Sequence, residues 1–147
     1  MALWQFDVAL TLRGSPSPVV TDEGYETTPL PELVVARATK YLTQHFGQPW
    51  EMMPRWFVFG QEDGNRFDVL VEETGVGAVS VRIDARAYAG HVLPRVTELA
   101  ELLGCMLYVP ERGICLNPTK QELEHAFSES RAARFVRDPH AFLTEAP

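Results

Sequence analysis

Residues 4–12 alternate between apolar and polar side chains, and no other feature of the chain restricts its fold as strongly. Gln5, Asp7 and Thr11 would lie on one face of an extended strand. A period of two over this length predicts a strand with one buried and one polar face. The apolar face would hold Trp4, Phe6, Val8, Leu10 and Leu12.

Two longer stretches carry apolar residues at helical spacing. Residues 31–46 predict a helix that ends at Gly47, and residues 91–103 predict a second that ends at Gly104. A capping box at residues 119–122 begins a third helix, because Ser or Thr followed three residues later by Glu satisfies the first free amides. We expect the inner stripes to be Val34, Ala38, Tyr41, Leu42 and Phe46 in the first helix, Val92, Val96, Leu99 and Leu103 in the second, and Leu123, Ala126, Phe127 and Ser130 in the third.

The other elements are short. An Asp-Gly pair in the turn at 61–65 is a strong hairpin signal. Residues 13–30 are expected to form a long loop that is mobile in part, and 48–55 an apolar connection. Asp138-Pro139 begins a last helical turn. Further strands are predicted at 56–60, 67–72, 79–85, 106–109 and 114–117, and in the third of these Ser80, Arg82 and Asp84 face outward.

Hairpins outnumber parallel crossovers in this order of elements, which favours an α+β fold. We expect one domain over residues 1–147, with a largely antiparallel mixed sheet of about five to six strands and three main helices packed on one face. A chain of 147 residues buries enough surface for a core without the help of a metal or disulfide.

The two cysteines, Cys105 and Cys115, are expected to be reduced and buried. The hairpin that joins them turns at 111–112, which places Cys115 opposite Tyr108, so the geometry disfavours a disulfide. Free thiols suit a reducing compartment. The N-terminus lacks the pattern of a signal peptide, and no run reaches the roughly 18 apolar residues of a membrane span. These features predict a cytoplasmic protein without membrane association.

The sequence carries no motif for catalysis, for nucleotide binding or for metal binding. Its four histidines do not stand at zinc-ligand spacing from one another or from a cysteine. Carboxylate pairs at 22–23, 62–63 and 72–73 are typical of solvated turns, whereas a glycosidase needs two carboxylates held apart across a cleft. We therefore expect no enzymatic activity, no cofactor and no metal.

The acidic character of the chain lies in its first half. The formal net charge is −7. Residues 1–74 hold 11 acidic and 5 basic side chains, a balance of −6, and residues 75–147 hold 9 and 8, a balance of −1. Nucleic-acid binders usually present a basic surface to phosphates. The composition therefore argues against a nucleic-acid partner and favours a basic protein.

An aromatic and methionine-rich stretch, residues 50–59, stands beside these acidic residues. The strand predicted at its end is apolar on both faces, so it lies between two layers or exposes one face. Two interpretations stay open: core alone, or core together with an interface, where aromatic residues and Met are enriched and acidic side chains steer a basic partner. The predicted partner-binding residues are Asp22, Glu23, Glu62, Asp63 and Glu72 for steering, and Trp50, Met53 and Trp56 for anchoring.

Four segments between residues 79 and 143 share a pattern with a known class of proteins. They are Val81-Arg82-Ile83-Asp84-Ala85-Arg86, Leu99-Ala100-Glu101-Leu102-Leu103-Gly104-Cys105, Tyr108-Val109-Pro110-Glu111-Arg112-Gly113, and Ser130-x-x-Ala133-x-Phe135-Val136-x-Asp138-Pro139-x-x-Phe142-Leu143. They resemble segments of small bacterial immunity proteins, which neutralise toxins delivered between competing bacteria. The resemblance implies a non-enzymatic binder that blocks the active site of a cytoplasmic-acting toxin.

The expected order of elements from residue 31 onward, α-β-β-β-α-β-β-α, is similar to that of type III secretion chaperones. Those proteins are small and acidic, form dimers and wrap an extended effector segment. This chain differs by the added strand at 4–12 and the loop that follows it. An immunity-type inhibitor, monomeric or weakly dimeric when free, is the first hypothesis. A dimeric chaperone is the second, and a small enzyme of unrecognised type is the third.

Overall fold

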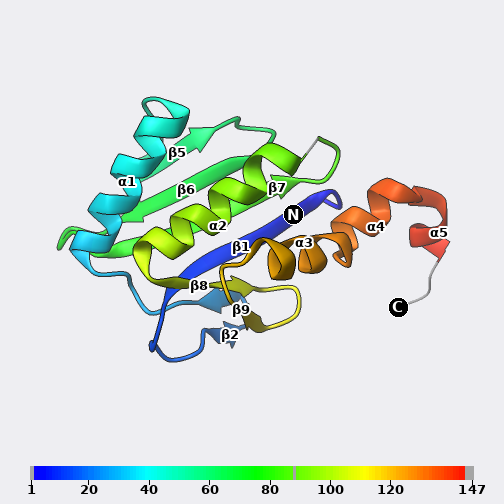
Figure 1. Ribbon diagram of the computed structural model, residues 1–147, viewed down its shortest axis with the longest axis horizontal. Coiled ribbons are helices and arrows are strands. Elements are labelled where there is room, and N and C mark those ends of the chain that lie inside the picture. The colour runs from blue at the N-terminus through cyan, green and yellow to red at the C-terminus, as the bar shows by residue number, and fades with distance from the viewer. Residues whose placement is uncertain (1, 88, 145–147) are drawn as a thin grey trace.

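A seven-stranded sheet with helices on one face organises the protein (Figure 1). The structure, a computed structural model, describes residues 2–87 and 89–144. Neighbouring strands are all antiparallel in the order β4-β5-β6-β7-β1-β8-β9. The strands are β1 (Gln5–Leu12), β4 (Trp50–Met53), β5 (Trp56–Gly60), β6 (Arg66–Val71), β7 (Gly77–Asp84), β8 (Cys105–Val109) and β9 (Ile114–Leu116). The predicted single-domain α+β fold is confirmed, with seven strands in this sheet where five to six were expected.

The first strand lies inside the sheet, between β7 and β8. Phe6 stands opposite Ile83, Val8 opposite Val81, and Leu10 opposite Leu107. Every one of these side chains is at most 1% exposed. The alternation of residues 4–12 therefore marks a central strand whose apolar face is the middle of the core.

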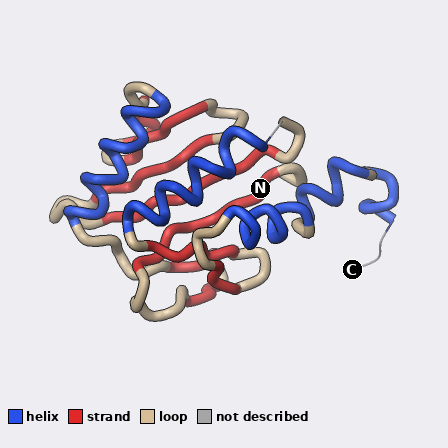
Figure 2. The backbone as a smooth tube through the Cα atoms, viewed as in Figure 1, coloured by secondary structure: helices blue, strands red, loops and turns tan. Residues whose placement is uncertain are grey.

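Three helices cover that apolar face (Figure 2). In the second helix all four residues of the predicted stripe are buried, and Gly104 ends the helix in the left-handed conformation at φ 68°, where glycine carries no steric penalty. The first helix is rotated slightly from the prediction, with Val35 buried in place of Val34 and Phe46 36% exposed. The helices are α1 (Glu32–Phe46), α2 (Val92–Leu103), preceded by the short 3-10 turn η1 (Ala89–His91), and α3 (Lys120–Ser128).

The C-terminal end contains two further helices, α4 (Arg131–Arg137) and α5 (Pro139–Thr144). The second is the predicted last turn, but α4 was not predicted. Ser130 was assigned to the stripe of α3, whereas its hydroxyl caps α4 by accepting the N–H of Ala133 at 3.1 Å. The predicted N-cap of α3 forms, with Thr119 Oγ1 accepting the Glu122 N–H at 3.2 Å. The reciprocal half of the capping box does not form, because the Glu122 carboxylate accepts the N–H of Asn117 and the Thr119 N–H donates to the Asn117 carbonyl.

Two stretches that were expected to be irregular contain strands. Residues 13–30 include the hairpin of β2 (Val19–Thr21) and β3 (Gly24–Glu26), and residues 48–55 include β4. The hairpin strands are too short to show a period, and β4 is an edge strand, where prolines on either side are tolerated. The ring of Tyr25 in β3 lies 5.3 Å from that of Tyr108. The hairpin therefore packs on the sheet face opposite the helices.

The predicted hairpin register is confirmed, because Cys115 stands opposite Tyr108 and both thiols are free. Cys105 is fully buried as expected, but the expectation of a buried Cys115 is wrong. Cys115 lies on the edge strand β9 and is exposed. Among the helices of the described residues, none is both long and apolar enough to span a membrane.

Leu99 tests the packing of α2, since its side chain is fully buried. Leu99→Ala should lower the free energy of unfolding by about 2–5 kcal/mol, the range for a cavity left by a buried leucine. Leu102, on the same helix, is 45% exposed, so Leu102→Ala should change it by less than about 0.5 kcal/mol. Urea denaturation of both variants measures the difference, and equal effects would contradict the assigned inner face.

The two thiols should react with a disulfide reagent at different rates. Burial raises the pKa of Cys105 to about 11, so at pH 8 its thiolate is scarce and shielded. Cys115 should react in the native protein, and Cys105 only after unfolding. Counting released chromophore before and after adding urea tests this, and Cys115→Ser should remove the fast phase alone. Two fast phases in native protein would disprove the burial of Cys105.

Candidate functional site

The helices α1, α2 and α3 pack on one face of the sheet, and within residues 2–87 and 89–144 no helix lies over the β4–β7 half of the second face. In each strand, side chains point alternately to the core and to this second face, and the strand register aligns the outward-facing residues of neighbouring strands. We call this half the open face and define it by Trp50, Met53, Trp56, Leu70, Ser80 and Arg82. The other half lies under the β2–β3 hairpin and the loop before it, where Ala9, Thr11 and Tyr108 are buried.

The apolar margin of the open face is formed at the β4–β5 turn. Pro54 and Arg55 form a two-residue turn, in which Arg55 takes a φ of 68°, and this brings Met53 opposite Trp56. Trp56 in turn stands opposite Leu70. Met53 is 58% exposed and Leu70 42%. Large apolar side chains therefore meet solvent side by side here, as they do at the centres of protein interfaces.

A buried ion pair supports this margin from below. Asp68 accepts hydrogen bonds from the indole Nε1 of Trp56 at 2.9 Å and from Arg66 Nη2 at 3.1 Å. A second contact joins Arg66 Nε to Asp68 Oδ1 at 3.0 Å. Arg66 is 5% and Asp68 8% exposed. The Trp56 ring is thus held in a fixed orientation by a charge pair that the fold has already removed from water.

A second, looser pair lies on β1 and β7. Arg82 Nε is 3.6 Å from Asp7 Oδ1 and has no hydrogen-bond partner, although that nitrogen is buried. Burial raises the pKa of the Asp7 carboxyl above its ordinary value, and Arg82 offsets this only in part. The phenol of Tyr25 has a raised pKa as well, because of burial and then the nearby charge of Asp7. Asp7 is thus a partly buried carboxylate whose contact with Arg82 is long, at 3.6 Å.

These groups surround a depression of about 210 Å³ in the open face. Trp56 and Leu70 line one part of it, and Tyr25, Asp7 and Arg82 line another. The depression combines aromatic walls with one acceptor and one donor that are not fully engaged. Such a site is suited to holding a polar or charged side chain whose stem packs on the rings.

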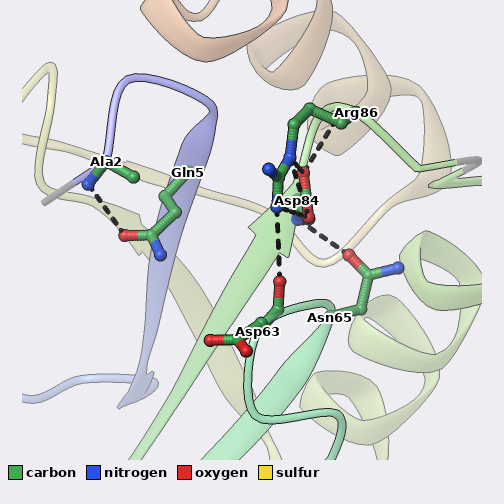
Figure 3. Close-up of polar contacts among 6 residues, drawn as sticks. All are labelled: Ala2, Gln5, Asp63, Asn65, Asp84 and Arg86. Atoms are coloured by element: carbon green, nitrogen blue, oxygen red, sulfur yellow. Dashed lines mark hydrogen bonds and ion pairs between the residues drawn. The ribbon is translucent and has the colours of Figure 1, made fainter.

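A separate polar cluster fixes the turn between β5 and β6 (Figure 3). Asp84 accepts from Arg86 Nη2 at 2.8 Å, and its own N–H donates to Asn65 Oδ1 at 2.8 Å. Arg86 Nη2 also reaches the carbonyl of Asp63 at 3.5 Å. The hydrogen bonds from Arg86 hold the pKa of the Asp84 carboxyl below its ordinary value. The Glu62-Asp63 tip is thereby tied to the end of β7.

The acidic excess of the protein belongs to the strands and connections rather than to the helices. The helices α1 to α5 contain five acidic and seven basic residues, a balance of +2. The remaining described residues contain fourteen acidic and six basic ones, a balance of −8. Three of the seven basic residues belong to α4, and Arg131 of that helix lines a depression together with Gln5 and Asp7.

The predicted partner-binding residues fall into three places. Trp50, Met53 and Trp56 lie together on the open face, and Glu72 lines a depression at the β4–β5 turn together with Met53 and Trp56. The Glu62-Asp63 tip lies at the other end of the β5–β6 hairpin. Asp22 and Glu23 form the tip of the β2–β3 hairpin. The structure therefore gathers the proposed anchors with one acidic residue and places the other four acidic residues at two separate turns.

Sequence reasoning missed the polar centre of this face, namely Asp7, Arg66, Asp68 and Arg82. The alternation of apolar and polar residues in β1 and β7 did predict that Asp7 and Arg82 face away from the core. Their proximity depends on the pairing of β1 with β7, and no local pattern specifies that pairing. The strand was predicted to begin at Phe67, one residue after Arg66, so the pairing of Arg66 with Asp68 was not foreseen.

In the described part of the chain, no group of three or more His, Cys, Asp or Glu side chains is arranged to hold a metal ion. Comparisons with protein-family models, with curated proteins and with solved structures found no match. The chemistry of the open face therefore rests on its own geometry: exposed aromatic and aliphatic area, a buried ion pair beneath it, and a partly engaged Asp7 and Arg82.

Removing the charge of Asp68 should destabilise the fold, because Arg66 would remain buried without its counter-ion. Asp68→Asn should lower the free energy of unfolding by about 3 kcal/mol. Asp63→Asn removes the same charge at an exposed position and should change stability by less than about 0.5 kcal/mol. Chemical denaturation compares the two, and a neutral Asp68→Asn would show that the pair is not needed.

Proposed function

We propose that this protein is an immunity-type inhibitor, which binds a basic toxin domain through the open face and occludes that toxin's active site. The observation that carries the proposal is the group of exposed apolar side chains, Trp50, Met53 and Leu70, on a sheet face without a covering layer. Exposed aromatic and methionine side chains at this density favour a protein partner. The resemblance of residues 79–143 to immunity proteins points in the same direction.

The charge distribution supports a basic partner. The sheet and connections have a balance of −8, and two of the acidic turns, at Asp22-Glu23 and Glu62-Asp63, are exposed. Charges around an interface raise the association rate by attracting the oppositely charged partner. A toxin that handles nucleic acid or nucleotides needs a basic active site, and an acidic blocker complements it.

A growth test decides the proposal. The product of the gene adjacent to the one that encodes this chain is expressed in a bacterial host and should arrest growth. Co-expression of this chain should restore growth, and the two proteins should co-purify. Failure of the adjacent product to bind this chain, or growth arrest that the chain does not relieve, would count against an inhibitor. A chain that is by itself a stable dimer in solution would favour the secretion-chaperone alternative.

Variants at the Glu62-Asp63 tip should change the association rate constant for that toxin, and a variant at Trp50 should change the dissociation rate constant. Glu62→Lys combined with Asp63→Lys should slow association, most at low salt, because salt screens steering charges. Trp50→Ala should mainly speed dissociation, because it removes buried contact area. Surface plasmon resonance at two salt concentrations separates these effects.

The matched control for Trp50→Ala is Leu33→Ala on α1, which is 69% exposed but lies on a helix that packs on the other side of the sheet. It should leave both rate constants unchanged. If the double lysine variant associates normally at low salt, the Glu62-Asp63 tip is no part of the recognition surface, and the acidic excess serves solubility.

A further inference from the structure

Three depressions follow one another across the second face of the sheet. The first, about 370 Å³, is bordered by Leu3, Gln5, Asp7 and the Pro110-Glu111 turn. The second is the 210 Å³ depression already described, and it shares Asp7 with the first. The third, about 670 Å³, extends over the β4–β5 turn. It shares Trp56 and Leu70 with the second.

The first two depressions adjoin at Asp7 and the last two at Trp56 and Leu70, and we call this row of three adjoining depressions, which runs diagonally across the strands, the transverse groove. It extends from the β8–β9 turn over β1, β7, β6 and β5 to β4. Five inter-strand spacings of roughly 4.8 Å give about 24 Å perpendicular to the strands. The path also shifts along β7 from the level of Asp7 and Arg82 to that of Leu70 and Ala78, so its diagonal length is about 27 Å, which an extended chain covers with about eight residues.

The charges that line the groove are predominantly negative. Carboxylates are contributed by Asp7, Asp68, Glu72, Glu73 and Glu111, and guanidinium groups by Arg55, Arg82 and Arg131. The balance of these eight side chains is −2. Arg66 neutralises Asp68 from below and Arg55 contacts Glu73 at 3.3 Å. Asp7 has the longer contact with Arg82, at 3.6 Å, and is therefore the more weakly paired carboxylate at the centre of the groove.

We infer that the transverse groove binds one extended, basic segment of the partner, laid across the strands with a cationic side chain beside Asp7 and an apolar one against Trp56 and Leu70. This inference rests on the proposed function and adds the part of the toxin that is held. The central depression, at about 210 Å³, has room for about one large side chain, which suits a single side chain of an extended segment better than a helix about 10 Å in diameter. Aromatic walls next to a carboxylate favour a lysine or arginine.

The experiment uses a fluorescein-labelled peptide of alternating lysine and leucine, and a matched peptide with glutamate in place of every lysine. The basic peptide should bind the intact protein in fluorescence anisotropy, and the acidic one should not. Asp7→Asn should weaken binding roughly fivefold, the size of one partly exposed ion pair. Glu101→Gln, which removes an exposed carboxylate from α2, is the matched control and should leave the affinity unchanged.

A second variant keeps the test valid if Asp7→Asn fails to fold. Leu70 is 42% exposed, so Leu70→Lys should fold normally, and its added charge should repel the basic peptide. In ¹⁵N NMR spectra the indole signal of Trp56 should shift on adding the peptide, while amides of α1 stay in place. Equal binding of both peptides, or shifts confined to the helices, would overturn the groove.

The toxin itself separates this inference from the proposed function. If the toxin is neutralised but Asp7→Asn and Leu70→Lys bind it as tightly as the native chain, the groove is wrong and the inhibitor proposal stands. If the basic peptide binds as expected but the adjacent gene product is not neutralised, the groove stands and the inhibitor proposal fails. If Leu70→Lys abolishes toxin binding while the basic peptide does not bind, the open face holds a folded surface, and the extended segment is refuted.

Discussion

The pairing of β1 with both β7 and β8 is the interaction on which the rest of the structure depends. Gln5 is paired with Asp84 and Ala9 with Tyr108, so the first strand joins segments from the second half of the chain. Without β1, the β4–β7 and β8–β9 strands would form two separate small sheets, neither of which could support a common helical layer. The same pairing that places Phe6, Val8 and Leu10 in the core also sets Asp7 against Arg82 on the opposite face.

Elements of this fold were predictable where their sequence pattern involves residues close together in the chain. Alternation in residues 4–12, the stripe of α2 and the Thr119 cap depend on neighbours a few residues apart, and they were predicted correctly. The two hairpin strands β2 and β3 are three residues long, so they carry no period. Strand β4 is flanked by prolines, and α4 follows α3 so closely that Ser130 was read as helix interior.

The candidate site was predicted in part, for a related reason. Composition identified Trp50, Met53 and Trp56, because aromatic residues beyond the needs of one strand face are visible in the sequence. The polar centre was not identified, because Asp7, Arg82 and Asp68 come from three strands that only long-range register brings together. Alternation showed which way Asp7 and Arg82 face but not that they face each other.

The buried pair of Arg66 and Asp68 links the stability of the open face to its recognition chemistry. A surface ion pair contributes little to stability. The Arg66–Asp68 pair is already desolvated in the free protein, so partner binding adds no further cost of removing these two charges from water. Trp56 is held by the same carboxylate, so its ring loses little rotational freedom on binding, which reduces the entropic cost of association. Asp7 and Arg82 behave differently, because their contact is longer, at 3.6 Å, and their side chains are 24% and 35% exposed, within reach of a partner. A partner that supplies the missing hydrogen bonds would gain most at that point, and the rigid aromatic margin and the incomplete polar centre would then act as two parts of one recognition surface.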